Sequence, residues 1–197
     1  LLALAGGALL PVSADLAEIW HNASAWWISL GSGMPGHGDP FGYVLAVLAI
    51  LALGNGSAAV LTLILLAMPL AGLAAWVAAG AFTQRRSLRL WAAFLWASLP
   101  VLQVALGSGR LGALIAHLMI PWAVLGLVRA TGSAVQRLNP DPLKPRPEVI
   151  HKPGINGIPS WTAAAAAGLC LAVITASAPS LLPVFIIFVG IICLKRG

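Results

Sequence analysis

Charged residues are scarce in this sequence. Only 8% of its 197 residues are charged, whereas 60% are hydrophobic. A soluble domain carries about 25% charged residues, so this chain lacks the polar side chains that would cover a soluble globule. The composition excludes an ordinary soluble domain and predicts an integral membrane protein surrounded by lipids. Apolar runs rich in Ala, Leu and Gly, with few strictly alternating stretches, favour transmembrane helices over a β-barrel.

Cysteine is also scarce. The two cysteines, Cys170 and Cys193, lie within apolar runs and lack the spacing of metal ligands, which indicates inert thiols. The net charge of +6 comes from basic residues in short loops between apolar runs, where orientation in the bilayer explains them. We therefore expect no nucleic-acid partner.

The two ends of the chain are unusual for a complete membrane protein. The chain begins with LLALAGGALLPV, which has no methionine and no basic flank, so it does not match a signal peptide. This run is typical of the outer half of a transmembrane helix, and the final IICLKRG follows directly after another apolar run. We expect a fragment of a longer protein whose first span is truncated.

Five apolar segments follow the first one. Residues 41–53 are too few to cross about 30 Å of hydrocarbon at about 1.5 Å per residue. Residues 57–82, 88–106 and 111–128 are long enough to span, and they contain Pro69, Pro100 and Pro121 respectively. Residues 161–194 accommodate two more spans, broken near residues 177–180. The sequence thus predicts an all-α, polytopic membrane helical bundle of about six spans.

Basic residues predict the orientation of this bundle. Ten of the eleven Lys and Arg residues lie in three places. These are loop 83–87 together with the nearby Arg89, loop 129–160, and the C-terminal tail. All ten fall on one side if residues 41–53 do not span, and an excess of Lys and Arg marks the cytoplasmic side. We therefore expect a multi-pass plasma-membrane protein in which these loops and the C-terminus are cytoplasmic. The loop 13–56 is then extracytoplasmic, with residues 41–53 as an interfacial helix.

This layout divides the chain into three regions. Residues 1–130 form the membrane bundle with its outer loop, residues 131–160 form a cytoplasmic loop, and residues 161–197 form a C-terminal helical pair. The cytoplasmic loop contains six prolines between residues 139 and 160. Because proline lacks an amide donor and disfavours helix in its predecessor, we expect this loop to be extended or partly disordered.

The predicted outer loop contains three of the five acidic residues, Asp15, Glu18 and Asp39. Asp15 lies three residues after the predicted end of the first span, where a carboxylate can act as a general base at the membrane surface. It can equally cap a short amphipathic helix over residues 16–30, with Glu18 completing a capping box. The residues alone leave both roles open.

Histidines in the same loop extend this set of candidates. His21 lies three residues after Glu18 on the expected helix, so the pair can share a proton or a metal ion, or form a solvated helix face. Asp39 follows glycines and precedes a proline, which is typical of a turn. With His37 it offers two ligands for a divalent metal, which are too few to define a metal site.

Arg110 and His117 lie within the apolar stretch GSGRLGALIAHLMIPW (residues 107–122). Arg110 is the only basic residue on the predicted outer face, and it precedes a helix whose N-terminal end attracts anions. A guanidinium binds phosphate bidentately, so we expect Arg110 to contact the phosphate of an ordinary lipid or of a lipid-linked substrate. His117 lies two turns further on, near the bilayer middle, where it faces the bundle interior. It would hydrogen-bond another helix, with Gln103 as candidate partner, or transfer a proton.

The run SLRLWAAFLWASLPVLQVALGSGRLGALIAHLMIPWAVLGLVRA resembles the membrane region of large actinobacterial glycosyltransferases, which are family 2 enzymes with a multi-span tail. More distantly, the chain resembles the GT-C fold of polyprenyl-phosphate-sugar-dependent enzymes such as arabinofuranosyltransferases. The resemblance covers residues 11–131. It implies a transferase that acts on cell-envelope glycans and binds a polyprenyl-phosphate-linked sugar or a glycan acceptor. In GT-C enzymes the catalytic acid lies in the first outer loop, soon after span one, and Asp15 is the matching position.

The family 2 resemblance implies a different location for the chemistry. Family 2 enzymes catalyse transfer in a soluble nucleotide-sugar domain with an acidic metal motif, and this chain contains no Asp-any-Asp motif. Catalysis would then occur outside this chain, which would serve as an anchor or as a site for the lipid-linked acceptor. We expect no cofactor within the chain itself, although a divalent metal remains open. A transporter or flippase subunit and a non-catalytic membrane anchor are the alternative functions.

Overall fold

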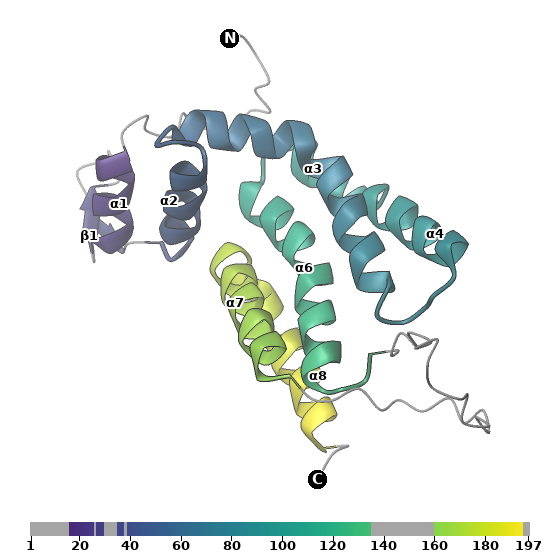
Figure 1. Cartoon of the computed structure of the whole chain (residues 1–197). Helices are drawn as coiled ribbons and strands as arrows, with labels where there is room; N and C mark the ends of the chain where they lie inside the picture. The colour runs from purple at the N-terminus through teal and green to yellow at the C-terminus, as the bar shows by residue number, and fades with distance from the viewer. Residues whose placement is uncertain (1–15, 26, 30–34, 38, 135–159, 195–197) are drawn as a thin grey trace, which may run out of the picture.

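The computed structural model describes residues 16–25, 27–29, 35–37, 39–134 and 160–194 (Figure 1). Helices dominate this part of the chain, as the sequence predicts. In chain order they are α1 (Leu16–Ser24), α2 (Phe41–Leu51), α3 (Gly56–Ala79), α4 (Arg86–Ala97), α5 (Pro100–Gly107), α6 (Leu111–Ala130), α7 (Trp161–Ser177), the 3₁₀ turn η1 (Pro179–Leu181) and α8 (Leu182–Leu194). The expected first span and residues 135–159 of the proline-rich loop lie outside the described residues.

Three helical segments in the described part of the chain are long and apolar enough to cross a membrane. They are Gly56–Ala79, Arg86–Gly107 and Leu111–Ala130, which correspond to the predicted segments 57–82, 88–106 and 111–128. Helices α2 and α7 are apolar but shorter than these segments. The structure therefore supports three candidate spans among the described residues, and the expected total of about six is not confirmed.

The chain between residues 177 and 182 breaks where the sequence predicts. Helix α7 ends at Ser177, and η1 turns the chain into α8. Figure 1 shows the chain turning at η1 between α7 and α8.

Helix α6 is the centre of the bundle. Its span is 50% buried, compared with 33% for the α3 span and 11% for the Arg86–Gly107 segment. Figure 1 shows α6 between α3 and α7. The main core combines small and large side chains of α3, α5 and α6: Ala67, Ala71, Leu102, Ala105, Leu114, Ile115 and Leu118.

Glycines allow α6 and α7 to approach closely. A Cβ on Gly126 would lie 3.0 Å from the Cβ of Ala167, and a Cβ on Gly112 would overlap the backbone carbonyl of Ser177. Small residues at such contacts are typical of membrane helices, because lipid chains are as apolar as side chains and association depends on close packing. The two contacts also show that α7 runs antiparallel to α6.

Proline has different effects in the three candidate spans. Pro69 lies inside α3 and Pro121 lies inside α6, and Figure 1 shows α3 changing direction partway along its length. Pro100 instead ends the preceding helix, so the single span expected over residues 88–106 is divided into α4 and α5. Leu99 has a ψ of 134°, which is the extended conformation that a residue before proline prefers.

The region before α2 differs from the expected helix over residues 16–30. Helix α1 ends at Ser24, and a two-stranded antiparallel ladder follows, formed by β1 (Trp27–Ser29) and β2 (Pro35–His37). This short ladder is a departure from the expected all-α fold, although the other regular elements of the described residues are helical. Its first strand contains tryptophan and isoleucine, which favour extended structure. Helix α1 packs on α2 through Ile19, which contacts Ala46 and Ala49.

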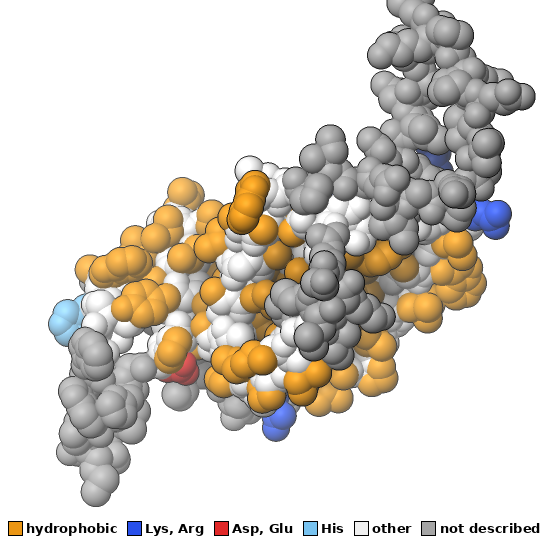
Figure 2. Space-filling view, turned by 90° about the horizontal axis from the view of Figure 1, so that it is seen from below, with side chains coloured by type: hydrophobic (Ala, Val, Ile, Leu, Met, Phe, Trp, Pro, Cys, Tyr) orange, Lys and Arg blue, Asp and Glu red, His pale blue; other side chains and the backbone are white. Residues whose placement is uncertain are grey.

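Large apolar side chains are exposed over much of the described surface. Figure 2 shows hydrophobic side chains spread across one face, with charged side chains near its margins. Helix α4 has no buried residue. A bilayer would cover such a surface at no hydrophobic cost, whereas water would not. The exposed set on α3 and α4 includes Leu65, Leu66, Leu73, Leu90, Trp91, Phe94 and Leu95.

The glycine contact between α6 and α7 generates a test of this packing. We expect Gly112→Ala to lower the free energy of unfolding by about 1–3 kcal/mol, because the new methyl group overlaps the backbone of Ser177. Chemical unfolding of the detergent-solubilised chain measures this change. Gly168→Ala is the control, since a Cβ there meets nothing within 4 Å. Equal stability of Gly112→Ala and the wild-type chain would show that α6 and α7 are not in this contact.

Candidate functional site

Arg110 lies in the tight turn between α5 and α6. Gly109 takes a φ of +67°, and the Arg110 amide donates to the carbonyl of Ala105 at 2.9 Å. This turn places Arg110 immediately before the first residue of α6, and its side chain is exposed. Within the described residues the guanidinium has no hydrogen bond or ion pair. It is therefore able to bind an anion beside the positive end of the α6 dipole.

His117 is buried on α6, with 5% of its surface exposed. Its ring stacks on the indole of Trp96, with 4.6 Å between ring centroids and 18° between the planes. Its Nε2 lies 3.1 Å from the Trp96 carbonyl oxygen. A carbonyl oxygen only accepts, so Nε2 carries the proton and donates it to this bond.

The Trp96 carbonyl needs this donor because of Pro100. In a continuous helix the amide of residue 100 would donate to residue 96, but proline has no N–H. The Leu99 amide reaches the Trp96 oxygen only at 3.5 Å. His117 from the neighbouring helix therefore supplies the missing hydrogen bond, which is how membrane helices tolerate a break.

Other side chains donate to two more carbonyls of the break. The Ser98 hydroxyl donates to Leu95 O at 3.3 Å, and the Gln103 amide donates to Ser98 O at 3.3 Å. The expected pairing of Gln103 with His117 is therefore wrong. The two residues bind different carbonyls of the same break, and His117 has the interhelical structural bond that was one of its two predicted roles.

The outer-loop candidates do not converge on one site within the described residues. Asp15 lies outside them. Glu18 and His21 are exposed on α1. Asp39 accepts the Phe41 amide through Oδ1 at 2.9 Å, so it forms the turn that the sequence predicts and opens α2. No group of three His, Cys, Asp or Glu residues in the described part of the chain is placed to hold a metal ion.

A second candidate site lies at the turn between α3 and α4. Arg89 donates from Nε to the Trp76 carbonyl at 3.1 Å, and its Cζ lies 3.7 Å from the centroid of the Trp76 ring. A Cβ on Gly80 would lie 3.0 Å from this guanidinium, so glycine leaves the space that the arginine fills. In the sequence, Arg89 is recognisable only as one of the basic residues that predict the orientation of the bundle.

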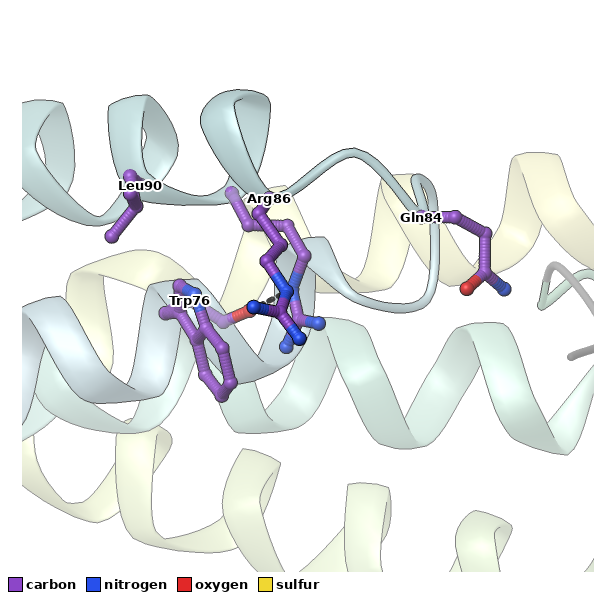
Figure 3. Close-up of a pocket in the computed structure, with 5 residues that line it drawn as sticks. Trp76, Gln84, Arg86 and Leu90 are labelled. Atoms are coloured by element: carbon purple, nitrogen blue, oxygen red, sulfur yellow. Dashed lines mark hydrogen bonds between the residues drawn. The ribbon is translucent and has the colours of Figure 1, made fainter.

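A cleft of about 520 Å³ opens beside this pair, and we call it the arginine cleft. Figure 3 shows Arg86 reaching toward Trp76, while Gln84 lies on the connecting loop and Leu90 on α4. None of the lining residues is acidic. The cleft is lined by Trp76, Gln84, Arg86, Arg89 and Leu90.

One feature of the sequence is consistent with the pairing of Trp76 and Arg89. Trp76 and Arg89 lie equally far from the middle of the turn between Ala79 and Arg86, and residues placed in this way face each other in an antiparallel helix pair. The signal depends on knowing where both helices end.

No family model, curated protein or solved structure matches this chain. The class of protein therefore follows from the structure itself. It is a helical protein whose described residues include three apolar helical segments long enough to span a membrane.

The role of His117 can be separated from its packing. We expect His117→Phe to keep the stacking on Trp96 but to lower the free energy of unfolding by about 1–3 kcal/mol, because it leaves the partly buried Trp96 carbonyl with only the long bond from the Leu99 amide. The same substitution should cost less in a Pro100→Ala background, since alanine at that position restores the backbone N–H for the Trp96 carbonyl. Chemical unfolding of the four chains in detergent completes this double-mutant cycle. An equal cost in both backgrounds would refute the compensation.

Proposed function

We propose that this chain is the membrane module of a glycosyltransferase that acts on cell-envelope glycans. In this proposal it binds a polyprenyl-phosphate-linked sugar or acceptor at its outer face. The proposal rests on the resemblance of residues 11–131 to such modules. The structural observation that supports it most directly is the exposed guanidinium of Arg110, which has no partner within the described residues and lies at the start of a candidate span.

A lipid-linked phosphate fits the surroundings of Arg110. The side chain lies at the end of α5 and the start of α6, where a membrane-embedded chain would meet headgroups. The guanidinium offers a bidentate fork to phosphate, and the first turn of α6 adds a positive dipole end. The adjacent α5 exposes Val101 and Val104, which provide an apolar surface for the start of a polyprenyl chain.

The catalytic part of the proposal centres on Asp15. This residue immediately precedes α1, where Glu18 and His21 are exposed, so they are candidates to support a general base. If the chain instead corresponds to a family 2 tail, catalysis belongs to another part of the polypeptide. The chain then retains only the lipid-phosphate site.

We also propose a sidedness for the chain in the plasma membrane. Loops 83–87 and 129–160 and the C-terminus are cytoplasmic, and loop 13–56 is extracytoplasmic. Packing supports this arrangement, because Ala78 and Ala81 at the end of α3 contact Leu125 near the end of α6. Both basic loops therefore begin at the same end of the bundle, which is the end opposite Arg110.

The helix break gives a transporter or flippase subunit as the second candidate. Transporters place their substrate sites at discontinuous membrane helices, and α4 and α5 form such a pair. However, three of the carbonyls released by the break are bound by the side chains of Ser98, Gln103 and His117. These three carbonyls are engaged within the protein rather than offered to a ligand, which favours the transferase module. A non-catalytic anchor is the third candidate.

The phosphate site is tested by replacing Arg110. We expect Arg110→Gln to weaken binding of a polyprenyl phosphate to the detergent-solubilised chain by about tenfold or more, because a charge-assisted hydrogen bond is worth about 1.5–3 kcal/mol. Native mass spectrometry with titrated lipid measures the affinity. Arg129→Gln removes the same charge from the other end of α6 and should leave binding unchanged. Equal affinities for the two variants would remove the proposed site.

Sidedness is tested by labelling with a membrane-impermeant maleimide in a chain whose Cys170 and Cys193 are replaced by alanine. Met34→Cys in the outer loop should react in right-side-out vesicles, and Ser133→Cys should react only after permeabilisation. These outcomes follow from the preference of basic loops for the cytoplasm. The reverse pattern would invert the proposed topology.

A further inference from the structure

We propose that the arginine cleft binds the phosphate headgroup of an anionic membrane phospholipid. The acyl chain of this lipid would lie along Leu90, Trp91 and Phe94 of α4. The site lies at the opposite end of the Arg86–Gly107 segment from Arg110, so it is independent of the proposed transferase function.

Arg89 is already held in position for such a headgroup. Its Nε donates to the Trp76 carbonyl at 3.1 Å, and its guanidinium lies on the Trp76 ring. These contacts fix the plane of the guanidinium, which reduces the conformational entropy lost on binding. The two terminal nitrogens have no hydrogen-bond partner within the described residues, so they can donate to phosphate oxygens.

Arg86 and Gln84 complete the polar part of the cleft. Arg86 is exposed and lines the same cleft as Arg89, and Figure 3 shows its side chain extending beside Trp76. No carboxylate lines the cleft to balance the two guanidinium groups. A phosphate would supply the opposite charge, and the Gln84 amide would add a neutral donor.

An apolar surface continues directly from this polar site. A second cleft of about 380 Å³ is lined by Ser87, Leu90, Trp91 and Phe94, and Leu90 lines both clefts. The Trp91 and Phe94 rings meet edge to face, with 6.2 Å between centroids. They are exposed to 61% and 65%, so lipid can reach them from the side.

The two adjoining clefts favour a phospholipid over a free anion. Inorganic phosphate would use only the polar cleft, whereas a phospholipid would use both and would also cover exposed apolar surface. Trp76 at the end of a candidate span matches the headgroup region, where tryptophan is enriched in membrane proteins.

The polar contact is tested with phosphatidylglycerol and the full 197-residue chain in detergent, by native mass spectrometry. We expect Arg86→Gln to weaken lipid binding about fivefold, since a basic residue near an anionic lipid surface contributes about 1 kcal/mol. Arg85→Gln is the matched control, because Arg85 is one residue away and does not line the cleft. Equal weakening by both variants would show non-specific charge attraction and would overturn the site.

Gly80→Ala tests the same site without removing a charge. Its new Cβ would lie 3.0 Å from Arg89 Cζ and would push the flexible guanidinium from its place. The backbone of Gly80 is right-handed helical, with φ of −63°, which alanine also adopts, although the Cβ would lie 3.1 Å from the Val77 carbonyl oxygen. We expect weaker lipid binding in a chain that still unfolds cooperatively. Unchanged lipid binding would argue against Arg89 as a ligand.

The apolar contact and the identity of the ligand have separate tests. Phe94→Ser should weaken phosphatidylglycerol binding more than Leu95→Ser, because Leu95 is also exposed but lies outside the second cleft. Inorganic phosphate at the concentration of the lipid should not displace it. Displacement by phosphate would identify a soluble anion as the ligand. Tighter binding of a polyprenyl phosphate than of phosphatidylglycerol at this cleft would overturn the assignment to an ordinary phospholipid.

Discussion

The hydrogen-bonding needs of the backbone govern this structure where Pro100 interrupts a candidate span. A carbonyl left without a partner in an apolar environment costs several kcal/mol, so the break persists only if other groups donate to it. Ser98 and Gln103 do so from the broken segment, and His117 does so from α6. The stacking of His117 on Trp96 holds the donor in place. The structural hydrogen bond thereby explains why His117 lies in the middle of an apolar helix, and no catalytic role is needed to account for it.

Close packing of α6 makes this compensation possible. His117 reaches Trp96 only because α6 lies between its neighbours at a defined depth and rotation. On its other side, Gly112 and Gly126 permit backbone contact with α7. Without a strong hydrophobic force between helices in lipid, small residues of this kind determine which helix faces meet. The buried hydrogen bond and the glycine contacts therefore support the same arrangement.

The charged side chains described here lie away from this apolar centre. Arg110 is at one end of the Arg86–Gly107 segment, and Arg86 and Arg89 are at the other. The arginines at the two ends differ in the contacts that hold them. Arg110 is exposed and unpaired within the described residues, whereas Arg89 is held by a carbonyl and an aromatic face. A phosphate-bearing amphiphile suits both ends, because each places a cation beside exposed apolar side chains.

The sequence by itself determined the class of the structure and the positions of its long helices. Length and apolarity are local properties, so the spans over residues 57–82 and 111–128, the break after Ser177 and the turn at Asp39 were predictable. Only the tertiary structure decided the partner of His117, the end of α4 before Pro100 and the pairing of Trp76 with Arg89. Three candidate spans contain proline, and the local pattern does not show which one has a donor on a neighbouring helix. Such pairings depend on the depth and rotation of the packed helices. Depth and rotation are in turn set by contacts between residues that lie far apart in the sequence.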